Sequence, residues 1–94
     1  QVLMVAWMNM ESLKLTLTTK DMIYWSRSRK KIWKKGEISG NYQKLVSLFK
    51  DCDGDCLLAK VQQQGPACHT NRKFCFYTEI TSGMEKVVAA PILN

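Results

Sequence analysis

The amino-acid sequence predicts a small α+β domain, rich in β-strands, with one helix near its N-terminal end. Its 94 residues suit one domain, because single domains commonly run to roughly 100–150 residues. Short runs of β-branched and aromatic residues, bounded by turn residues, predict strands along most of the chain. Apolar residues at helical spacing follow a capping residue near the front and predict the single helix. We therefore expect one α+β domain over residues 1–94.

The expected helix begins after Asn9, which suits the N-cap position, and ends at about Lys20. Leu13 and Leu17 lie four residues apart and would share one face of this helix. The strands are expected over residues 2–8, 22–28, 42–52, 56–63 and 74–80. The segment 29–41 is basic and then rich in turn residues, so we expect it to be mostly loop.

Asp53 and Gly54 predict a hairpin turn between the strands expected over 42–52 and 56–63. Both residue types tolerate the positive φ that a two-residue type I′ turn requires. These two strands should therefore pair in the antiparallel direction.

The composition describes a basic chain that is able to fold. Lys and Arg number 14 against 8 Asp and Glu, for a formal charge of +6, and 46% of the residues are hydrophobic. These values do not fit a disordered chain, and no apolar run reaches the roughly 20 residues of a membrane span. A domain this small buries only about 60–65% of its unfolded surface, so we expect a metal, disulfides or dimerisation to add stability. The apolar start at Gln1 lacks both an initiator Met and the features of a signal peptide, so we expect a missing N-terminal segment.

Four cysteines allow two interpretations: Cys52, Cys56, Cys68 and Cys75. In a secreted protein they would form two disulfides, in one of three pairings. The chain shows no secretory signal, and its cysteines stand beside residues that often bind metals, so we favour a metal site. Cys56 fits no ligand spacing and is expected to be a small buried apolar residue.

Three aspartates alternate with other residues at the expected hairpin: Asp51, Asp53 and Asp55. Their charges would repel one another without a cation, and carboxylate oxygens suit Mg²⁺, whereas the neighbouring thiol of Cys52 suits Zn²⁺. An EF-hand is excluded, because its sixth position needs Gly and here holds Cys56. The alternative is a solvated acidic hairpin tip without a metal.

A second cluster combines Cys68, His69 and Cys75 with the more distant Cys52. Three protein ligands with an open fourth position are typical of catalytic zinc rather than structural zinc. His69 could move a proton or serve as a fourth ligand, and the alternative is an ordinary hydrogen-bonded histidine.

A third cluster runs from Tyr24 to Gly36 and interleaves basic, aromatic and serine residues. Its cations could bind phosphates while its tryptophans stack on a base. Binding of RNA or single-stranded nucleic acid is a competing hypothesis. A solvated basic face with tryptophans in the core is the simplest alternative.

Together these clusters resemble the phosphoribosyl-AMP cyclohydrolase family of histidine biosynthesis. The resemblance is carried by residues 6–9 (AWMN), 24–29 (YWSRSR), 33–41 (WKKGEISGN), 51–55 (DCDGD), 65–70 (GPACHT) and 74–77 (FCFY). The DCDGD and GPACHT motifs at this separation are far more specific together than either is alone. The resemblance extends from about Val2 to Tyr77, most of the chain.

The resemblance implies a cytoplasmic, metal-dependent hydrolase that opens the adenine ring of phosphoribosyl-AMP between N1 and C6. It implies an intertwined homodimer with zinc at the interface, bound by Cys68 and Cys75 of one chain and Cys52 of the other. Mg²⁺ would be held by the three aspartates, Asp51, Asp53 and Asp55. No membrane and no nucleic acid takes part in this interpretation, and the alternative function is a zinc-stabilised basic module that binds RNA.

In this interpretation His69 is the catalytic residue that takes a proton from water or returns one to nitrogen. Arg27, Arg29, Lys34 and Lys35 would neutralise the phosphates of the substrate. Substrate binding as a whole is expected of Trp25, Ser26, Arg27, Arg29, Trp33, Lys35, Gly36, Glu37, Ser39 and Gly40.

Overall fold

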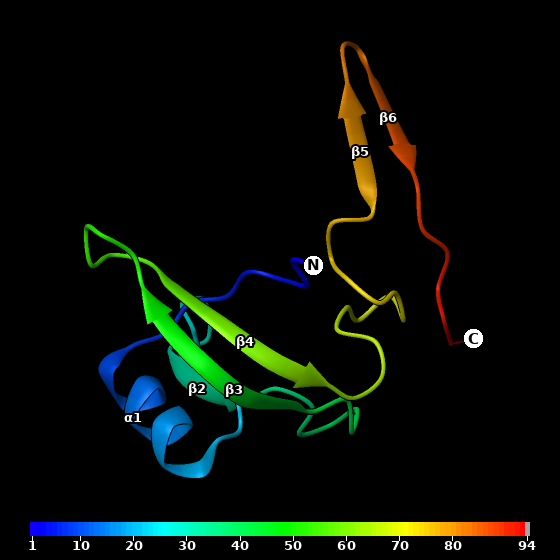
Figure 1. Ribbon diagram of the computed structural model, residues 1–94. Coiled ribbons are helices and arrows are strands. Elements are labelled where there is room, and N and C mark those ends of the chain that lie inside the picture. Colours follow the sequence, from blue (N-terminus) through cyan, green and yellow to red (C-terminus); the bar gives the residue numbers. More distant parts are fainter. Residues whose placement is uncertain (94) are drawn as a thin grey trace. The chain divides into compact units, whose positions relative to one another are not determined.

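The computed structural model describes residues 1–93 as a small α+β domain with one helix and three two-stranded antiparallel sheets (Figure 1). The predicted class, rich in β-strands with a helix near the front, is confirmed. The elements are α1 (Met10–Thr19), β1 (Ile23–Ser26), β2 (Lys31–Lys34), β3 (Gln43–Lys50), β4 (Leu57–Gln63), β5 (Thr78–Thr81) and β6 (Met84–Val87). They fall into two compact units, one spanning Ala6–Gln64 and the other joining Gln1–Val5 to the chain from Gly65 onward.

Helix α1 begins where the sequence predicts, because Asn9 and Ser12 cap each other. The Ser12 N–H donates to Asn9 Oδ1 at 2.8 Å, and the Asn9 N–H donates to Ser12 Oγ at 2.9 Å. The buried face is polar rather than leucine-rich, since Ser12 and Thr16 are buried while Leu17 is exposed. Thr16 Oγ1 accepts the Ile23 N–H at 3.0 Å and so ties α1 to β1.

Strand β2 was not expected, because its segment lies inside the basic stretch predicted to be loop. Ile32 and Trp33 are strong strand formers, and they pair with Trp25 and Tyr24 of β1. The two lysines that flank them lie at the ends of the strand, where charge is tolerated. The prediction of a loop is therefore wrong for Lys31–Lys34.

Strands β3 and β4 form the predicted hairpin, with a register shift between Leu45 and Ser47. The turn is not the predicted type I′, because Gly54 (φ 74°) has a positive φ and Asp53 does not. The Asp51 N–H instead donates to Cys56 O at 3.0 Å, closing a four-residue loop. This longer loop ends β3 at Lys50 rather than at residue 52.

The expected strand over residues 2–8 is wrong, because only Trp7 makes a β-type pairing there, with Trp25. Residues 1–5 instead belong to the other unit, in which Leu3 O accepts the Cys75 N–H at 2.7 Å. The expected strand over 74–80 is shorter at its start, since β5 begins at Thr78. Strand β6, which the sequence did not predict, returns beside β5 after Gly83.

The core of the Ala6–Gln64 unit is small. Its buried apolar side chains are Met22, Ile23 and Tyr24, while Gln43 is a buried polar residue. The Tyr24 hydroxyl donates a hydrogen bond to Gln43 Oε1 at 2.5 Å. The centroid of its ring lies 5.1 Å from the centroid of the Trp33 ring. At ten residues α1 is too short to cross a membrane, and the described residues include no longer helix.

Candidate functional site

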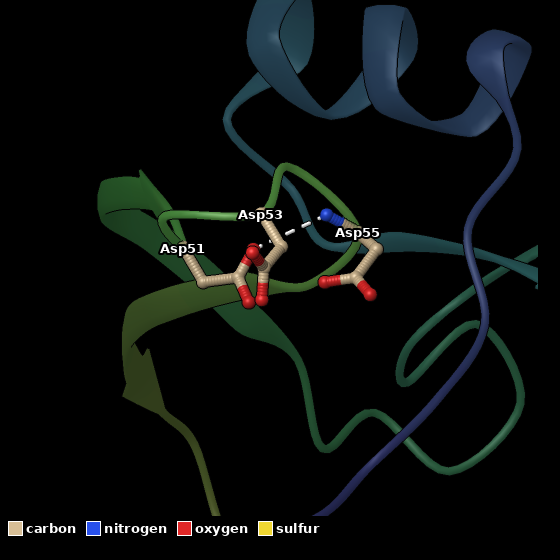
Figure 2. A group of neighbouring side chains, drawn as sticks. All are labelled: Asp51, Asp53 and Asp55. Carbon is tan, nitrogen blue, oxygen red and sulfur yellow. Dashed lines mark hydrogen bonds between the residues drawn. The ribbon is translucent and has the colours of Figure 1, made fainter.

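The β3–β4 loop gathers three carboxylates into one cluster (Figure 2). Asp51, Asp53 and Asp55 can each offer an oxygen such that all three oxygens lie within 4.8 Å of one another. All three residues are exposed, and within the described part of the chain no lysine or arginine forms an ion pair with them. Closely spaced hard oxygen donors with no protein cation beside them fit Mg²⁺.

Asp51 organises this loop as well as contributing to the cluster. Its Oδ1 accepts the Asp55 N–H at 3.1 Å, drawn in Figure 2, and the Cys56 N–H at 3.3 Å. Desolvation acts to raise the pKa of the Asp51 carboxyl, but hydrogen bonds from the backbone of Cys56 and Asp55 outweigh it and hold this pKa below its ordinary value. The carboxylate therefore stays ionised and available to a cation.

The cysteines of this loop differ from expectation in one respect. Cys52 and Cys56 are both exposed free thiols, so these two residues form no disulfide. The prediction that Cys56 is buried is wrong, because its backbone closes the hairpin while its side chain faces out of the exposed tip. Cys52 lies in the Ala6–Gln64 unit, whereas the other two predicted zinc ligands lie in the second unit.

Cys68 and Cys75, the other two predicted zinc ligands, flank a compact loop that folds back on itself. The Cys68 N–H donates to Arg72 O at 3.1 Å, and the Ala67 N–H donates to Lys73 O at 3.3 Å. Asn71 turns the chain in the left-handed conformation, with φ 64°. Cys68 is buried and Cys75 is exposed, so one sulfur has a sheltered environment and the other an open one.

His69 lies in the same loop, directly after Cys68, and its side chain is exposed. A solvent-accessible imidazole can exchange protons with water, as general acid–base chemistry requires. The soft sulfur donors and the adjacent imidazole fit the ligand preference of Zn²⁺.

A groove of about 490 Å³ lies along the β1–β2 hairpin and the turn that follows it. Seven of the ten predicted substrate-binding residues line it: Ser26, Arg29, Trp33, Lys35, Gly36, Glu37 and Ser39. Its charged side chains are mostly cationic, with Glu37 as the acidic exception. The groove therefore suits an anionic ligand of small-molecule size.

The remaining three predicted residues lie outside the lining of this groove. Trp25 pairs with Ile32 in the sheet, and the Arg27 guanidinium lies 4.0 Å from the centroid of the Trp7 ring. Gly40 closes the turn, since its N–H donates to Gly36 O at 2.8 Å. The groove also includes Lys34, which was expected to neutralise substrate phosphates, and Ser28, Lys31 and Ile38, which were not expected to contact the substrate. Strand β2 brings Lys31 and Lys34 to the groove, and the adjacent strand formers Ile32 and Trp33 were the signal that could have revealed it.

A separate hollow of about 360 Å³ lies between β4 and the start of β3. Asp21 joins two lysines there, at 2.5 Å from Lys44 Nζ and 3.3 Å from Lys34 Nζ. The hydrogen bond from Lys44 is the main reason why the pKa of Asp21 lies below its ordinary value. This ion-pair network fixes Lys34, which also lines the cationic groove.

A small α+β fold with a cationic groove, a carboxylate cluster and a cysteine-bearing loop defines a class of protein, an enzyme for a phosphorylated small molecule. Comparison with known proteins makes the class specific. The family model of phosphoribosyl-AMP cyclohydrolase matches residues 4–77. The chain belongs to the phosphoribosyl-AMP cyclohydrolase family.

Curated relatives agree with this assignment over almost the whole chain. The phosphoribosyl-AMP cyclohydrolases of Jannaschia sp. (strain CCS1) and Paracoccus denitrificans (strain Pd 1222) are each 59% identical over 91 residues. These alignments cover 97% of this chain and 76% and 75% of the two relatives, respectively. The corresponding protein of Cereibacter sphaeroides (strain KD131 / KCTC 12085) is 54% identical over 93 residues, which is 99% of this chain and 78% of that relative.

Proposed function

We propose that this chain hydrolyses the adenine ring of phosphoribosyl-AMP between N1 and C6, giving the formimino aminoimidazole carboxamide ribotide of histidine biosynthesis. The observation that carries the proposal is the family match over residues 4–77, supported by relatives at 59% identity. The alternative of an RNA-binding module lacks comparable support. The half-buried Trp33 ring packs near Tyr24, at 5.1 Å between centroids, and lines the groove of small-molecule size.

The cationic groove supports the substrate assignment. Arg29, Lys31 and Lys35 line it, and guanidinium and ammonium groups bind phosphate oxygens through charge-assisted hydrogen bonds. Serine hydroxyls at Ser26 and Ser28 add neutral donors along the same wall. In this proposal the groove binds a phosphate-bearing arm of the substrate and orients the adenine for attack.

Two metal sites complete the proposal. Cys68 and Cys75 would bind one zinc ion together with Cys52 of the partner subunit, and the three aspartates of the β3–β4 loop would bind Mg²⁺. When bound there, Zn²⁺ would supply the Lewis acidity that makes water nucleophilic at neutral pH. His69 would accept a proton from the attacking water at one imidazole nitrogen and return a proton to the departing ring nitrogen.

Sharing the zinc ligands between two chains requires a homodimer, and the surface supports one. Large apolar side chains stand exposed in both units, including Val46 at 63%, Val5 at 79% and Ile80 at 75%. Apolar exposure of this extent is typical of surfaces that a partner covers. A cytoplasmic location agrees with the proposal, because reducing conditions keep cysteine ligands available to a metal.

The first test supplies phosphoribosyl-AMP and follows the ultraviolet absorbance change of ring opening, with and without a zinc chelator. We expect turnover that the chelator abolishes and that added Zn²⁺ restores. Cys68→Ala should lose activity, while Cys56→Ala, which changes a cysteine outside the proposed ligand set, should keep it. A folded, zinc-loaded chain without turnover would refute the proposed activity.

The second test asks whether two chains build one site. Cys52→Ala and Cys68→Ala are each expected to be inactive, and mixing them under conditions of subunit exchange should restore activity. If the ligands come from different chains, random exchange restores about a quarter of the sites, because half of the dimers are mixed and each of these has one intact site. No recovery despite exchange would place the ligands in one chain.

A further inference from the structure

The side chain of Thr70 makes a direct contact with a proposed zinc ligand. Its hydroxyl donates a hydrogen bond to Cys68 Sγ at 3.1 Å. Cys68 is only 5% exposed, and Thr70 is half-buried, so the contact is partly sheltered from water. The backbone hydrogen bonds of Cys68 with Arg72 and Asn71 fix the loop that presents the two side chains to each other.

A hydroxyl that donates to a ligating sulfur has two effects on the metal site. It fixes the direction of the sulfur lone pairs, and it stabilises the negative charge that a thiolate ligand carries. Hydrogen-bond partners of metal ligands typically change metal affinity by about 10–100-fold when they are removed. Because Cys68 has so little access to water, solvent would replace this donor poorly.

We infer that Thr70 is a positioning residue that orients the Cys68 sulfur and strengthens zinc binding through its hydroxyl. The inference rests on the proposed function, since it takes Cys68 as a zinc ligand. The role inferred for Thr70 differs from that of its exposed neighbour His69, which transfers protons in the proposed function. Thr70 acts through the sulfur in this role.

The test measures zinc affinity by competition with a chromophoric chelator, using the full chain. Thr70→Val keeps the shape of the side chain and removes the donor, and we expect zinc affinity about 10-fold or more below wild type. Thr70→Ser keeps the donor and should lie within about threefold of wild type, a difference of about 0.7 kcal/mol. Thr81→Val, which makes the same change on the opposite, exposed face of β5, is the matched control and should bind zinc as wild type does.

A spectroscopic readout separates this role from a purely structural one. With Co²⁺ in place of zinc, the sulfur-to-cobalt charge-transfer band should shift in Thr70→Val and stay unchanged in Thr70→Ser. Equal zinc affinity and an unmoved band in Thr70→Val overturn the inference while leaving the proposed function intact. A wild-type chain that binds no zinc overturns the proposed metal site and this inference with it.

Discussion

Burial changes the chemistry of a single tyrosine in the core. Tyr24 is 8% exposed, and burial raises the pKa of its phenol from the ordinary 10.0 to about 12. Its hydroxyl donates a hydrogen bond to Gln43 Oε1, so the neutral phenol links strand β1 to strand β3. The residue therefore contributes a hydrogen bond as well as apolar area to a core that has few members.

We predict that Tyr24→Phe lowers the free energy of unfolding at neutral pH by about 1–2 kcal/mol, because a buried acceptor loses its donor. Between pH 10 and 12 the unfolded state releases a proton that the folded state keeps, so the stability of the wild type falls as pH rises. The difference in the free energy of unfolding between wild type and Tyr24→Phe should therefore narrow over that pH range. Denaturant titrations at several pH values measure it, and Tyr42→Phe, at a half-buried site beside Lys34, is the control.

A stability difference between wild type and Tyr24→Phe that stays constant from pH 7 to 12 would contradict the raised pKa of Tyr24. So would an equal alkaline response in the Tyr42→Phe and Tyr24→Phe variants, because that result would assign the pH dependence to other groups.

Asp53 offers a cleaner test of the carboxylate cluster than Asp51, which also accepts two backbone hydrogen bonds in its loop. We predict that Asp53→Asn weakens Mg²⁺ binding by about 10-fold or more, since a charged oxygen ligand is lost. Without Mg²⁺ the same variant should be at least as stable as wild type, because one repulsive charge is gone. Calorimetric titration with Mg²⁺ and thermal unfolding in chelator give the two measurements. Unchanged Mg²⁺ affinity would exclude Asp53 as a ligand.

Sequence reasoning located the aspartate cluster because its geometry is local. Three aspartates within five residues of a hairpin tip lie close together whatever the rest of the fold does. Cys56 was misjudged for the opposite reason, since its exposure depends on which way the closed hairpin turns its side chain. The contact between Thr70 and Cys68 also escaped prediction, because it depends on how the loop from Ala67 to Lys73 folds back.

At the scale of elements, the turn after β2 depends on one glycine. Gly36 has φ 85°, and a Cβ there would lie 2.7 Å from Asn41 C and Tyr42 N. Gly40 has a similar φ of 80° but open space around the position of a Cβ. The two residues close one turn, yet they should respond differently to the same substitution.

We predict that Gly40→Ala costs about 1–2 kcal/mol, from left-handed backbone strain alone. Gly36→Ala should cost at least about 3 kcal/mol, because backbone atoms must also move. It should raise the KM for substrate too, since Gly36 lines the cationic groove. Denaturant unfolding and steady-state kinetics measure both variants, and equal costs would show that the turn relaxes around the added methyl group.

Helices and strands were predictable where capping residues, turn residues and apolar patterns agreed. They were unpredictable where pairing with a distant strand decided the structure. Helix α1 and the β3–β4 hairpin follow from a capping residue and from a turn between two apolar runs. Strand β2 depends on its pairing with β1, which two strand formers in a lysine-rich segment are not enough to predict. The failed strand over residues 2–8 carries suitable residues, but the chain passes there from one unit to the other.

At the scale of the whole molecule, one chain leaves much apolar surface uncovered. The β5–β6 hairpin shows this most clearly, since all eight of its strand residues are exposed. Ile80 and Val87 lie on the same face of the hairpin, because Val87 pairs with Thr78, two residues before Ile80. A two-stranded hairpin is marginally stable alone in water, so a covering surface would stabilise it. In the proposed homodimer a second copy supplies that surface.

We predict that the thermal midpoint rises by a few degrees for each tenfold increase in protein concentration, because association stabilises the folded chain by mass action. Ile80→Glu, which replaces an exposed apolar side chain by a second carboxylate opposite Glu85, should abolish that dependence and yield a monomer by sedimentation. Thr81→Glu makes a similar change on the opposite face of β5 and should leave the dimer intact. Since the zinc ligands are proposed to come from both chains, Ile80→Glu should lose zinc binding together with dimerisation. Tight zinc binding by a monomeric Ile80→Glu variant would contradict the shared site.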